Sequence, residues 1–364
     1  MHTIEDLRIK QRLPLDIKVS MTKQRIREWV NHYGLDGVYV SFSGGKDSTV
    51  LLTLAREIYP DIKAVFVDTG LEYPEIREFV KKFENITWLK PSMNFKQVIE
   101  KYGYPFISKE VSGAISETCK YVDRKVPDNE NRLLILNELF EKEKLPVRAL
   151  QLLGKMPHKA HGEYTGEYSQ MYNKSKWKFL LNAKFRVSNQ CCNVMKKMPI
   201  HAYDKKTGRV AITAQMADES LQRQAQWLQN GCNAFDLKYP ISNPMSFWTE
   251  QDVLRYIKQN NIEICSVYGD ITVDYDEDFA GQMDISDFGL ADDIRSLKTT
   301  GCDRTGCMFC GFGCHTKNDD RFVRMKKTHP KQYDYIMRPK EQGGLNYKEI
   351  IDWINEHGNL NIKY

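Results

Sequence analysis

The segment Ser43-Gly44-Gly45-Lys46-Asp47-Ser48 constrains the fold of this chain more than any other. It lies between a short β-rich run, residues 37–42, and a segment with apolar residues at helical spacing, residues 49–58. Two adjacent glycines let the backbone turn sharply and approach a ligand closely, and the N-terminus of the following helix presents free N–H groups and a partial positive charge. Lys46 adds a full positive charge, and the two serines add hydroxyl donors. The segment therefore predicts a loop that binds phosphate.

A Walker A loop and a plain strand-to-helix turn are the other interpretations of this segment. A Walker A loop is excluded, because that motif needs Ser or Thr directly after Gly-Lys and Asp47 stands there. A plain strand-to-helix turn, with Asp47 or Ser48 as the helix cap, is the alternative. Such a turn has no need of two serines, two glycines and a lysine together.

Strand and helix patterns alternate along most of the chain. The β-rich runs are 37–42, 64–67 and 209–213, and the helical patterns are 20–33, 49–58, 74–83, 220–229 and 250–259. This alternation is typical of a parallel sheet with helices on both faces. We therefore expect an α/β fold with a doubly wound, mostly parallel sheet, an insertion at 119–182 where the rhythm breaks, and a cysteine-rich C-terminal region.

Composition excludes several classes of protein. The 364 residues are 41% hydrophobic and 28% charged, which is ordinary globular usage and excludes a fibrous or disordered chain. Apolar stretches are far shorter than the roughly 20 residues needed to cross a bilayer, and residues 1–6 do not resemble a secretory signal. We expect a soluble, cytoplasmic protein with no membrane partner.

Charge is distributed unevenly, although the net charge is only +5. Residues 148–197 contain ten Lys or Arg and two acids, whereas residues 268–293 contain nine acids and no Lys or Arg. The basic stretch predicts a surface for an anionic partner. The alternative is two solvated insertions that pair with each other.

Three further segments resemble a known superfamily. They are Val67-Asp68-Thr69-Gly70-Leu71-Glu72-Tyr73-Pro74-Glu75, then Ala217-Asp218-Glu219-Ser220 with Arg223, then residues 244–253 with Trp248. Together with the Ser43–Ser48 loop, and in the same order, they resemble the PP-loop superfamily of ATP pyrophosphatases, adenylyl-sulfate and phosphoadenylyl-sulfate reductases and thiolation enzymes. The resemblance covers about residues 20–330 and is greatest to the reductase branch.

This resemblance implies the fold of adenine nucleotide α-hydrolases. It implies an N-terminal helical segment at 1–36, a nucleotide-binding domain at 37–260 and a cysteine-rich region at 261–364. ATP and Mg²⁺ are the expected cofactors, with Lys46, Asp47 and Asp68 in catalytic roles. The nucleotide-binding residues that it implies are Ser43, Gly44, Gly45, Lys46, Asp47, Ser48, Asp68, Thr69, Gly70, Glu72, Glu219, Ser220 and Arg223.

Some of these residues have simpler structural explanations. Asp68 and Glu72 fit the turn chemistry of a strand end and a capped helix. Glu219 and Arg223 fit an i, i+4 surface ion pair. Trp248 fits a core position as well as a ligand contact.

Six of the nine cysteines fall in two clusters, Cys191-Cys192 and residues 302–314. Clustered cysteines in a chain without a signal peptide favour metal binding or catalysis over disulfides. The resemblance implies a [4Fe–4S] cluster held by Cys191, Cys192, Cys307 and Cys310, as in adenylyl-sulfate reductases.

The spacing of the cysteines in residues 302–314 also allows a second set of metal ligands. Cys302, Cys307, Cys310 and Cys314 can form a site of four thiolates, with His315 as a substitute ligand, and spacing does not distinguish iron–sulfur from zinc. The isolated Cys119, Cys232 and Cys265 are expected to be small buried hydrophobic residues.

The sequence departs from the reductase branch at one point that matters for function. Those reductases carry a nucleophilic cysteine in a Glu-Cys-Gly-aliphatic-His element on a mobile tail, and this chain has no such element; Cys314-His315 is the nearest match. We therefore expect an ATP pyrophosphatase-type enzyme that adenylylates an acceptor and supports sulfur transfer to nucleic acid, as in DNA phosphorothioation or RNA thiolation. The alternatives are reduction of adenylyl or phosphoadenylyl sulfate, and a non-enzymatic nucleotide-binding regulatory subunit.

The expected partners follow from this function. Residues 148–197 would bind the nucleic acid through phosphate contacts and through stacking on interleaved aromatic side chains. A cysteine desulfurase or another donor would supply the sulfur. The aromatic residues in question are Tyr164, Tyr168, Tyr172 and Trp177.

Overall fold

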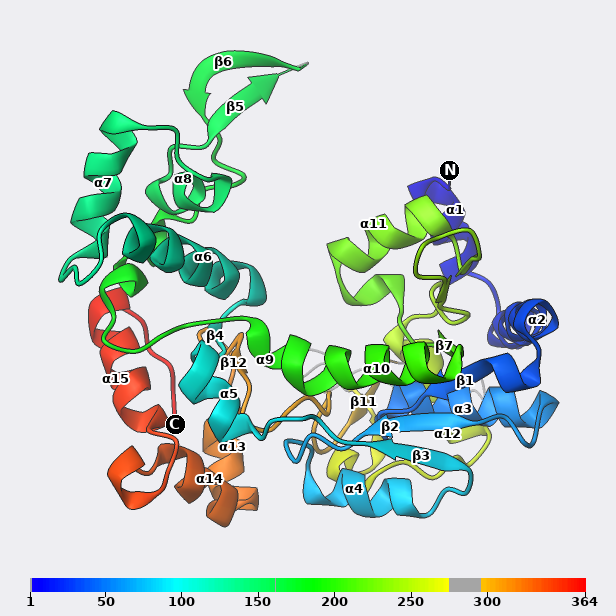
Figure 1. The fold of residues 1–364 in the computed structure, drawn as a ribbon. Coiled ribbons are helices and arrows are strands. Elements are labelled where there is room, and N and C mark those ends of the chain that lie inside the picture. The colour runs from blue at the N-terminus through cyan, green and yellow to red at the C-terminus, as the bar shows by residue number, and fades with distance from the viewer. Residues whose placement is uncertain (1, 161, 275–295) are drawn as a thin grey trace, which may run out of the picture. The chain divides into compact units, whose positions relative to one another are not determined.

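The computed structural model describes residues 2–160, 162–274 and 296–364. The chain forms two compact units (Figure 1). The first, the sheet unit, contains residues 1–68, 72–90 and 199–307. The second, the helical unit, contains residues 69–71, 91–198 and 308–364. Most of the acidic stretch at 268–293 lies outside the described residues, and the predicted organisation into 1–36, 37–260 and 261–364 stays a prediction.

The sheet unit is built around one six-stranded sheet with the strand order β3-β2-β1-β7-β9-β8. Every neighbouring pair is parallel except β8 and β9 at one edge, so the predicted α/β fold with a mostly parallel sheet is confirmed. The chain adds β2 and β3 on one side of β1 and then returns to the other side with β7. The strands are β1 Val38–Ser41, β2 Ala64–Val67, β3 Ile86–Leu89, β7 Val210–Ile212, β8 Asn233–Ala234 and β9 Ile241–Ser242.

Side chains of β1 alternate between the two faces of this sheet, as the pleat of a strand requires. Val38 and Val40 are fully buried in the main hydrophobic core. Tyr39 lies against Tyr203 of α10 (Met198–Thr207), with the ring centroids 5.3 Å apart, and its hydroxyl donates to Asp204 at 2.7 Å. Helices therefore cover both faces at the central strand.

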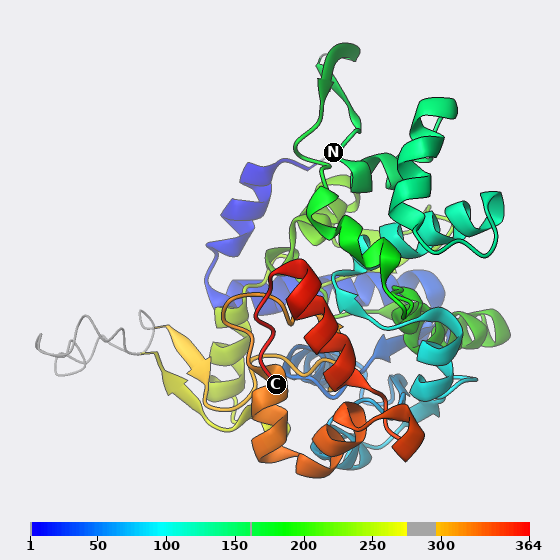
Figure 2. The same cartoon turned by 90° about the vertical axis from the view of Figure 1, so that its left-hand side faces the viewer.

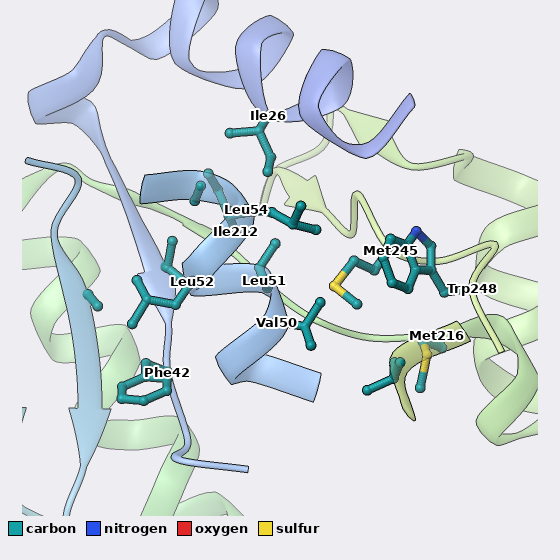
Figure 3. Packing of buried hydrophobic residues seen from close by; sticks show 14 of the residues in the cluster. Ile26, Phe42, Val50, Leu51, Leu52, Leu54, Ile212, Met216, Met245 and Trp248 are labelled. Carbon is teal, nitrogen blue, oxygen red and sulfur yellow. The ribbon is translucent and has the colours of Figure 1, made fainter. Parts of the chain in front are cut away.

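The main core joins β1 and β7 to the helices around them (Figure 3). Ile26 of α2 (Leu15–Tyr33), Leu51 and Leu54 of α3 (Lys46–Ile58) and Ile212 of β7 are all fully buried. Trp248 is also fully buried and donates its indole N–H to the Thr22 hydroxyl at 2.9 Å, so it occupies a core position. The other elements of this unit are α1 Ile4–Gln11, α4 Pro74–Lys81, α11 Leu221–Asn230, α12 Glu250–Gln259, β10 Ile271–Val273 and β11 Leu297–Thr299.

The helical unit combines residues 91–198 with the C-terminal segment. The two parts pair directly: β12 (Gly311–Phe312) runs parallel to β4 (Phe106–Ile107). The C-terminal helices α13 (Arg321–Thr328), α14 (Pro330–Met337) and α15 (Tyr347–Gly358), orange to red, lie next to one another in both views (Figure 2). The remaining elements are α5 Phe95–Tyr102, α6 Lys109–Lys125, α7 Arg132–Lys142, α8 Val147–Leu153, the hairpin β5 Pro157–Ala160 and β6 Glu163–Tyr168, and α9 Gln190–Cys192.

None of the helices in the described ranges is long and apolar enough to cross a membrane.

Candidate functional site

The predicted phosphate loop connects the carboxyl end of β1 to the start of α3. Gly44 adopts a left-handed φ of +72°, and a Cβ there would lie 2.8 Å from a methyl of Val80 and 2.9 Å from a methyl of Ile76. Only glycine fits such a position without strain. β1 lies between β2 and β7, where the order of strands reverses, which is the place where open α/β sheets bind ligands.

The serines of the loop bind one another and the backbone. Ser48 Oγ accepts the N–H of Ser43 at 3.1 Å, donates to the carbonyl of Gly45 at 2.9 Å and lies 3.0 Å from Ser43 Oγ. Gly45 is the N-cap of α3, and no side chain caps it. Neither Asp47 nor Ser48 is therefore the helix cap that the alternative of a plain turn assumes.

Lys46 is buried, with 2% of its surface exposed. Its ammonium group lies 3.0 Å from Glu250 Oε1, 3.6 Å from Asp47 Oδ1 and 3.0 Å from the carbonyl oxygen of Asp303. Burial opposes the charged form, but Asp47 and Glu250 outweigh it and raise the pKa of Lys46 above its ordinary value. The side chain therefore remains protonated and positively charged next to the loop.

The backbone N–H of Lys46, the first of α3, donates to the hydroxyl of Tyr268 at 3.0 Å. That hydroxyl also lies 2.7 Å from Thr305 Oγ1, and both hydroxyls are 3.1 Å from where a Cβ on Gly45 would lie. Tyr268 and Thr305 therefore touch the loop at the point where the helix N-terminus would meet an anion. The sequence carries no local signal for either residue, because both reach the loop from distant segments.

Asp47 has an unusual environment for a carboxylate. Burial raises its pKa above the ordinary range, with Lys46 opposing the shift and Glu250 adding to it. Its Oδ1 is buried and has no hydrogen-bond partner among the described residues. The Lys46 ammonium lies 3.6 Å from this oxygen as an ion pair, and a buried carboxylate oxygen that accepts no hydrogen bond also suits a hard cation such as Mg²⁺.

Glu219 follows β7, the strand beside β1. It forms ion pairs with Arg223, four residues along, and with Arg304, whose Nη1 is 3.5 Å from Glu219 Oε2. Burial and then the neighbouring Arg304 lower the pKa of Arg223. Ser220 caps α11 by accepting the N–H of Arg223 at 3.3 Å. The expected i, i+4 pair is thus present, and Arg304, which the sequence reasoning missed, joins it.

Asp68 lies directly after β2, at the same edge of the sheet as the loop. It is buried and accepts a hydrogen bond from Arg77 of α4 at 2.8 Å. Within the helical unit, the Thr69 hydroxyl accepts the N–H of Leu71 at 3.1 Å, and Gly70 has a left-handed φ of +74°. Glu72 stands just before α4. These contacts agree with a strand-end turn and leave the predicted nucleotide role of the segment open.

The cysteines are all free thiols. Cys302 and Cys307 belong to the sheet unit, whereas Cys191, Cys192, Cys310 and Cys314 belong to the helical unit. The Cys302 thiol is buried, 3.7 Å from the Tyr73 hydroxyl. Both predicted ligand sets therefore draw on both units.

Within the helical unit, three thiols act electrostatically on one buried phenol. The hydroxyl of Tyr347 donates to the carbonyl of Phe309 at 2.6 Å, and its pKa is raised strongly by burial and further by Cys191, Cys310 and Cys314. Burial raises the pKa of Cys314 to about 12 and that of Cys310 above its ordinary value. Across the described residues, however, no group of three or more His, Cys, Asp or Glu side chains is placed to hold a metal ion. The thiols have the chemistry for a soft metal, but the side chains as placed do not form its site.

The fold and the loop define an α/β protein of the PP-loop class. Comparison with known proteins identifies the family. A model of the phosphoadenosine phosphosulfate reductase domain matches residues 37–128 and 142–311. The chain belongs to this family, and the match supports an enzyme of that family.

Individual relatives match over shorter stretches. An uncharacterized protein of Methanocaldococcus jannaschii is 44% identical over 73 residues, which are 19% of this chain and 18% of that protein. The adenosine 5′-phosphosulfate reductase of Bacillus velezensis is 30% identical over 112 residues, 29% of this chain and 46% of the reductase. A Bacillus subtilis adenosine 5′-phosphosulfate reductase is 29% identical over the same shares. The matched stretches span less than half of the length of these relatives.

Proposed function

We propose that this protein binds ATP in the Ser43–Ser48 loop and cleaves it between the α- and β-phosphates. An acceptor oxygen attacks the α-phosphorus, the bond to the bridging oxygen breaks, and pyrophosphate leaves with the electron pair. The acceptor then carries AMP, and a sulfur nucleophile from a donor displaces it. The observation that carries the proposal is the loop, a turn that admits no side chain at Gly44 and leads into a helix without a side-chain cap.

The charge of each residue around the loop indicates its role: cationic groups would contact phosphate, and carboxylates would hold Mg²⁺. Lys46 and the N–H groups of α3 would neutralise the charge that develops on the leaving pyrophosphate. Asp47, whose buried Oδ1 accepts no hydrogen bond among the described residues, and Asp68 would hold Mg²⁺, which neutralises phosphate charge when bound. Glu219, Ser220 and Arg223 would contact the nucleotide from the β7 side.

Nucleotide binding is tested by titrating ATP into the wild type and into Lys46→Ala. We expect at least a tenfold weaker affinity in the variant, because a charge-assisted contact contributes about 1.5–3 kcal/mol. Lys63→Ala is the control, since Lys63 pairs with Asp36 on the surface of the same unit. Equal affinities in all three proteins would remove Lys46 from the site.

We propose nucleic acid as the acceptor, bound through residues 148–197. This proposal is supported by the exposed hairpin, on which Tyr164 is 70% exposed and Tyr168 is 49% exposed. The ammonium of Lys159 lies 4.5 Å from the centre of the Tyr164 ring. Exposed aromatic rings next to cations suit base stacking and phosphate contact. Replacing both tyrosines by Ala should weaken binding of single-stranded DNA or RNA and leave ATP binding unchanged; unchanged nucleic-acid binding would refute this surface.

Sulfate reduction is the second candidate, and the similarity to two adenosine 5′-phosphosulfate reductases favours it. In that reaction the substrate is adenylyl sulfate and a thiol supplies the electrons. The two candidates are separated by offering adenylyl sulfate with a dithiol, and separately ATP with nucleic acid. Release of sulfite in the first reaction, with no AMP formed from ATP in the second, would make sulfate reduction the function.

A thiolate centre is a further proposal, supported by the free thiols of the helical unit, three of which act electrostatically on Tyr347. Anaerobic purification followed by iron, sulfide and zinc analysis tests it. About four irons per chain, lost in Cys310→Ala and kept in the control Cys232→Ala, is the result expected for a four-thiolate cluster. About one zinc would indicate a structural site instead, and absence of both metals would refute the centre.

A further inference from the structure

The helical unit contains a hollow of about 890 Å³ whose lining includes no residue of the Ser43–Ser48 loop or of the β5–β6 hairpin, although residues 180–187 belong to the basic stretch 148–197. It is formed by the end of α5, the C-terminal half of α6, the start of α7 and the segment 180–187. Its volume lies in the range of sites for small molecules, about 300–1,000 Å³. Every residue that lines it belongs to the helical unit.

The charged residues of this hollow are almost all basic. Asp123 is its one acidic residue, and it is neutralised by Arg132, whose Nε is 2.7 Å from Asp123 Oδ1. The remaining basic side chains form no salt bridge in the described part of the chain, although Arg186 acts on Asp123 from a longer distance. They are Lys101, Lys120, Arg124, Lys184 and Arg186.

Backbone contacts hold some of these cations in place. Arg124 donates its Nε–H to the carbonyl of Lys120 at 3.1 Å, and Arg186 donates to the carbonyl of Lys101 at 3.2 Å. Both acceptors are neutral carbonyl oxygens, so neither contact cancels the positive charge. Five such charges around one concavity repel one another, and an anion at its centre would relieve that repulsion.

The floor of the hollow is apolar. Ile115, Leu180 and Leu181 are buried beneath it, and the rings of Tyr102 and Phe185 are half-buried in its wall. A purely inorganic anion would leave this surface unused, whereas a ring or alkyl group would cover it. Sites of this composition combine a few charged contacts with an apolar bed.

We propose that this hollow is a second binding site, for a small phosphate-bearing molecule with an aromatic or alkyl part. A nucleic-acid strand is the less suitable ligand, because it is read by a succession of exposed stacking platforms, while this site is one concavity with its rings in the wall. The proposal does not depend on ATP binding by the Ser43–Ser48 loop.

Hydrogen–deuterium exchange of the full chain tests the site locally. The probes are inorganic pyrophosphate, AMP and a short single-stranded oligonucleotide, each added to the wild type and to Lys46→Ala. AMP is expected to protect peptides covering residues 115–124 and 180–187 in both proteins, more strongly than pyrophosphate. Protection by AMP that disappears in Lys46→Ala would assign the effect to the loop and overturn the second site.

A pair of variants supplies the control. Lys120→Ala with Lys184→Ala removes two exposed cations of the hollow, and Lys327→Ala with Lys331→Ala removes two exposed lysines from α13 and α14. The first pair should weaken AMP binding at this site by about fivefold to tenfold and the second should leave it unchanged. Protection by the oligonucleotide alone, or by none of the probes, would overturn the proposal.

Discussion

Replacing Gly44 by Ala tests the close approach of Val80 and Ile76 to the loop. The substitution has two separate effects. An Ala at φ +72° is strained by about 1–2 kcal/mol. Its Cβ would also lie 2.8–2.9 Å from methyl groups of Val80 and Ile76, both buried and β-branched, so neither can turn away easily. Overpacking of this kind costs about 1–3 kcal/mol.

The expected loss for Gly44→Ala is therefore about 2–5 kcal/mol in the free energy of unfolding. Gly208 is a matched control, because it has the same φ of +72° but nothing within 4 Å of an added Cβ. Gly208→Ala should lose only the backbone contribution of about 1–2 kcal/mol. Equilibrium unfolding in urea, followed by circular dichroism, measures both variants. Equal losses in the two would refute the steric part of the reasoning and with it the tight approach of α4 to the loop.

Three other predictions concern single side chains. Tyr268→Phe removes the hydroxyl that accepts the first N–H of α3. Pyrophosphate should stabilise this variant against heat at least as much as it stabilises the wild type, because the anion can accept the freed N–H. A loss of pyrophosphate binding would mean that the hydroxyl shapes the loop. Glu250→Gln removes an acidic partner of Lys46. Because Glu250 would compete with phosphate for Lys46, the variant should bind ATP about twofold to fivefold more tightly in calorimetry. Weaker binding would contradict this competition. Burial raises the pKa of Cys119 to about 11. The rate of its alkylation by iodoacetamide, followed by peptide mass spectrometry, should therefore keep rising with pH up to about 11. A rate that levels off near the ordinary thiol pKa of about 8.5 would contradict the burial.

The parts of the fold that sequence could predict are those set by local patterns. The β-rich run before Ser43 and the helical spacing after Ser48 lie within a few residues of the loop, and strand–helix alternation leads directly to a parallel sheet. The glycine requirement at Gly44 follows from a turn that the chain must make at that point. For Trp248 the sequence allowed either a core position or a ligand contact, because periodicity alone does not distinguish the two.

The contacts that escaped prediction join segments far apart in the chain. Tyr268 and Thr305 lie more than two hundred residues after Lys46 in the sequence, and a tyrosine or threonine carries no motif that points to a loop so distant. The same holds for Arg304, which reaches Glu219. Spacing grouped Cys302 with Cys310 and Cys314, but the boundary between the compact units falls between Cys307 and Met308. Short spacing in sequence does not decide to which unit each residue belongs.

The central claim is that the Ser43–Ser48 loop holds the pyrophosphate part of ATP, and the products of ATP turnover test it most directly. ATP labelled at the α-phosphate is incubated with Mg²⁺ and the protein, with and without single-stranded DNA or transfer RNA, and the labelled products are separated by chromatography. We expect label in AMP or in an adenylylated acceptor, with release of pyrophosphate, and loss of both in Lys46→Ala. Label in ADP, or product formation unaffected by Lys46→Ala, would contradict it.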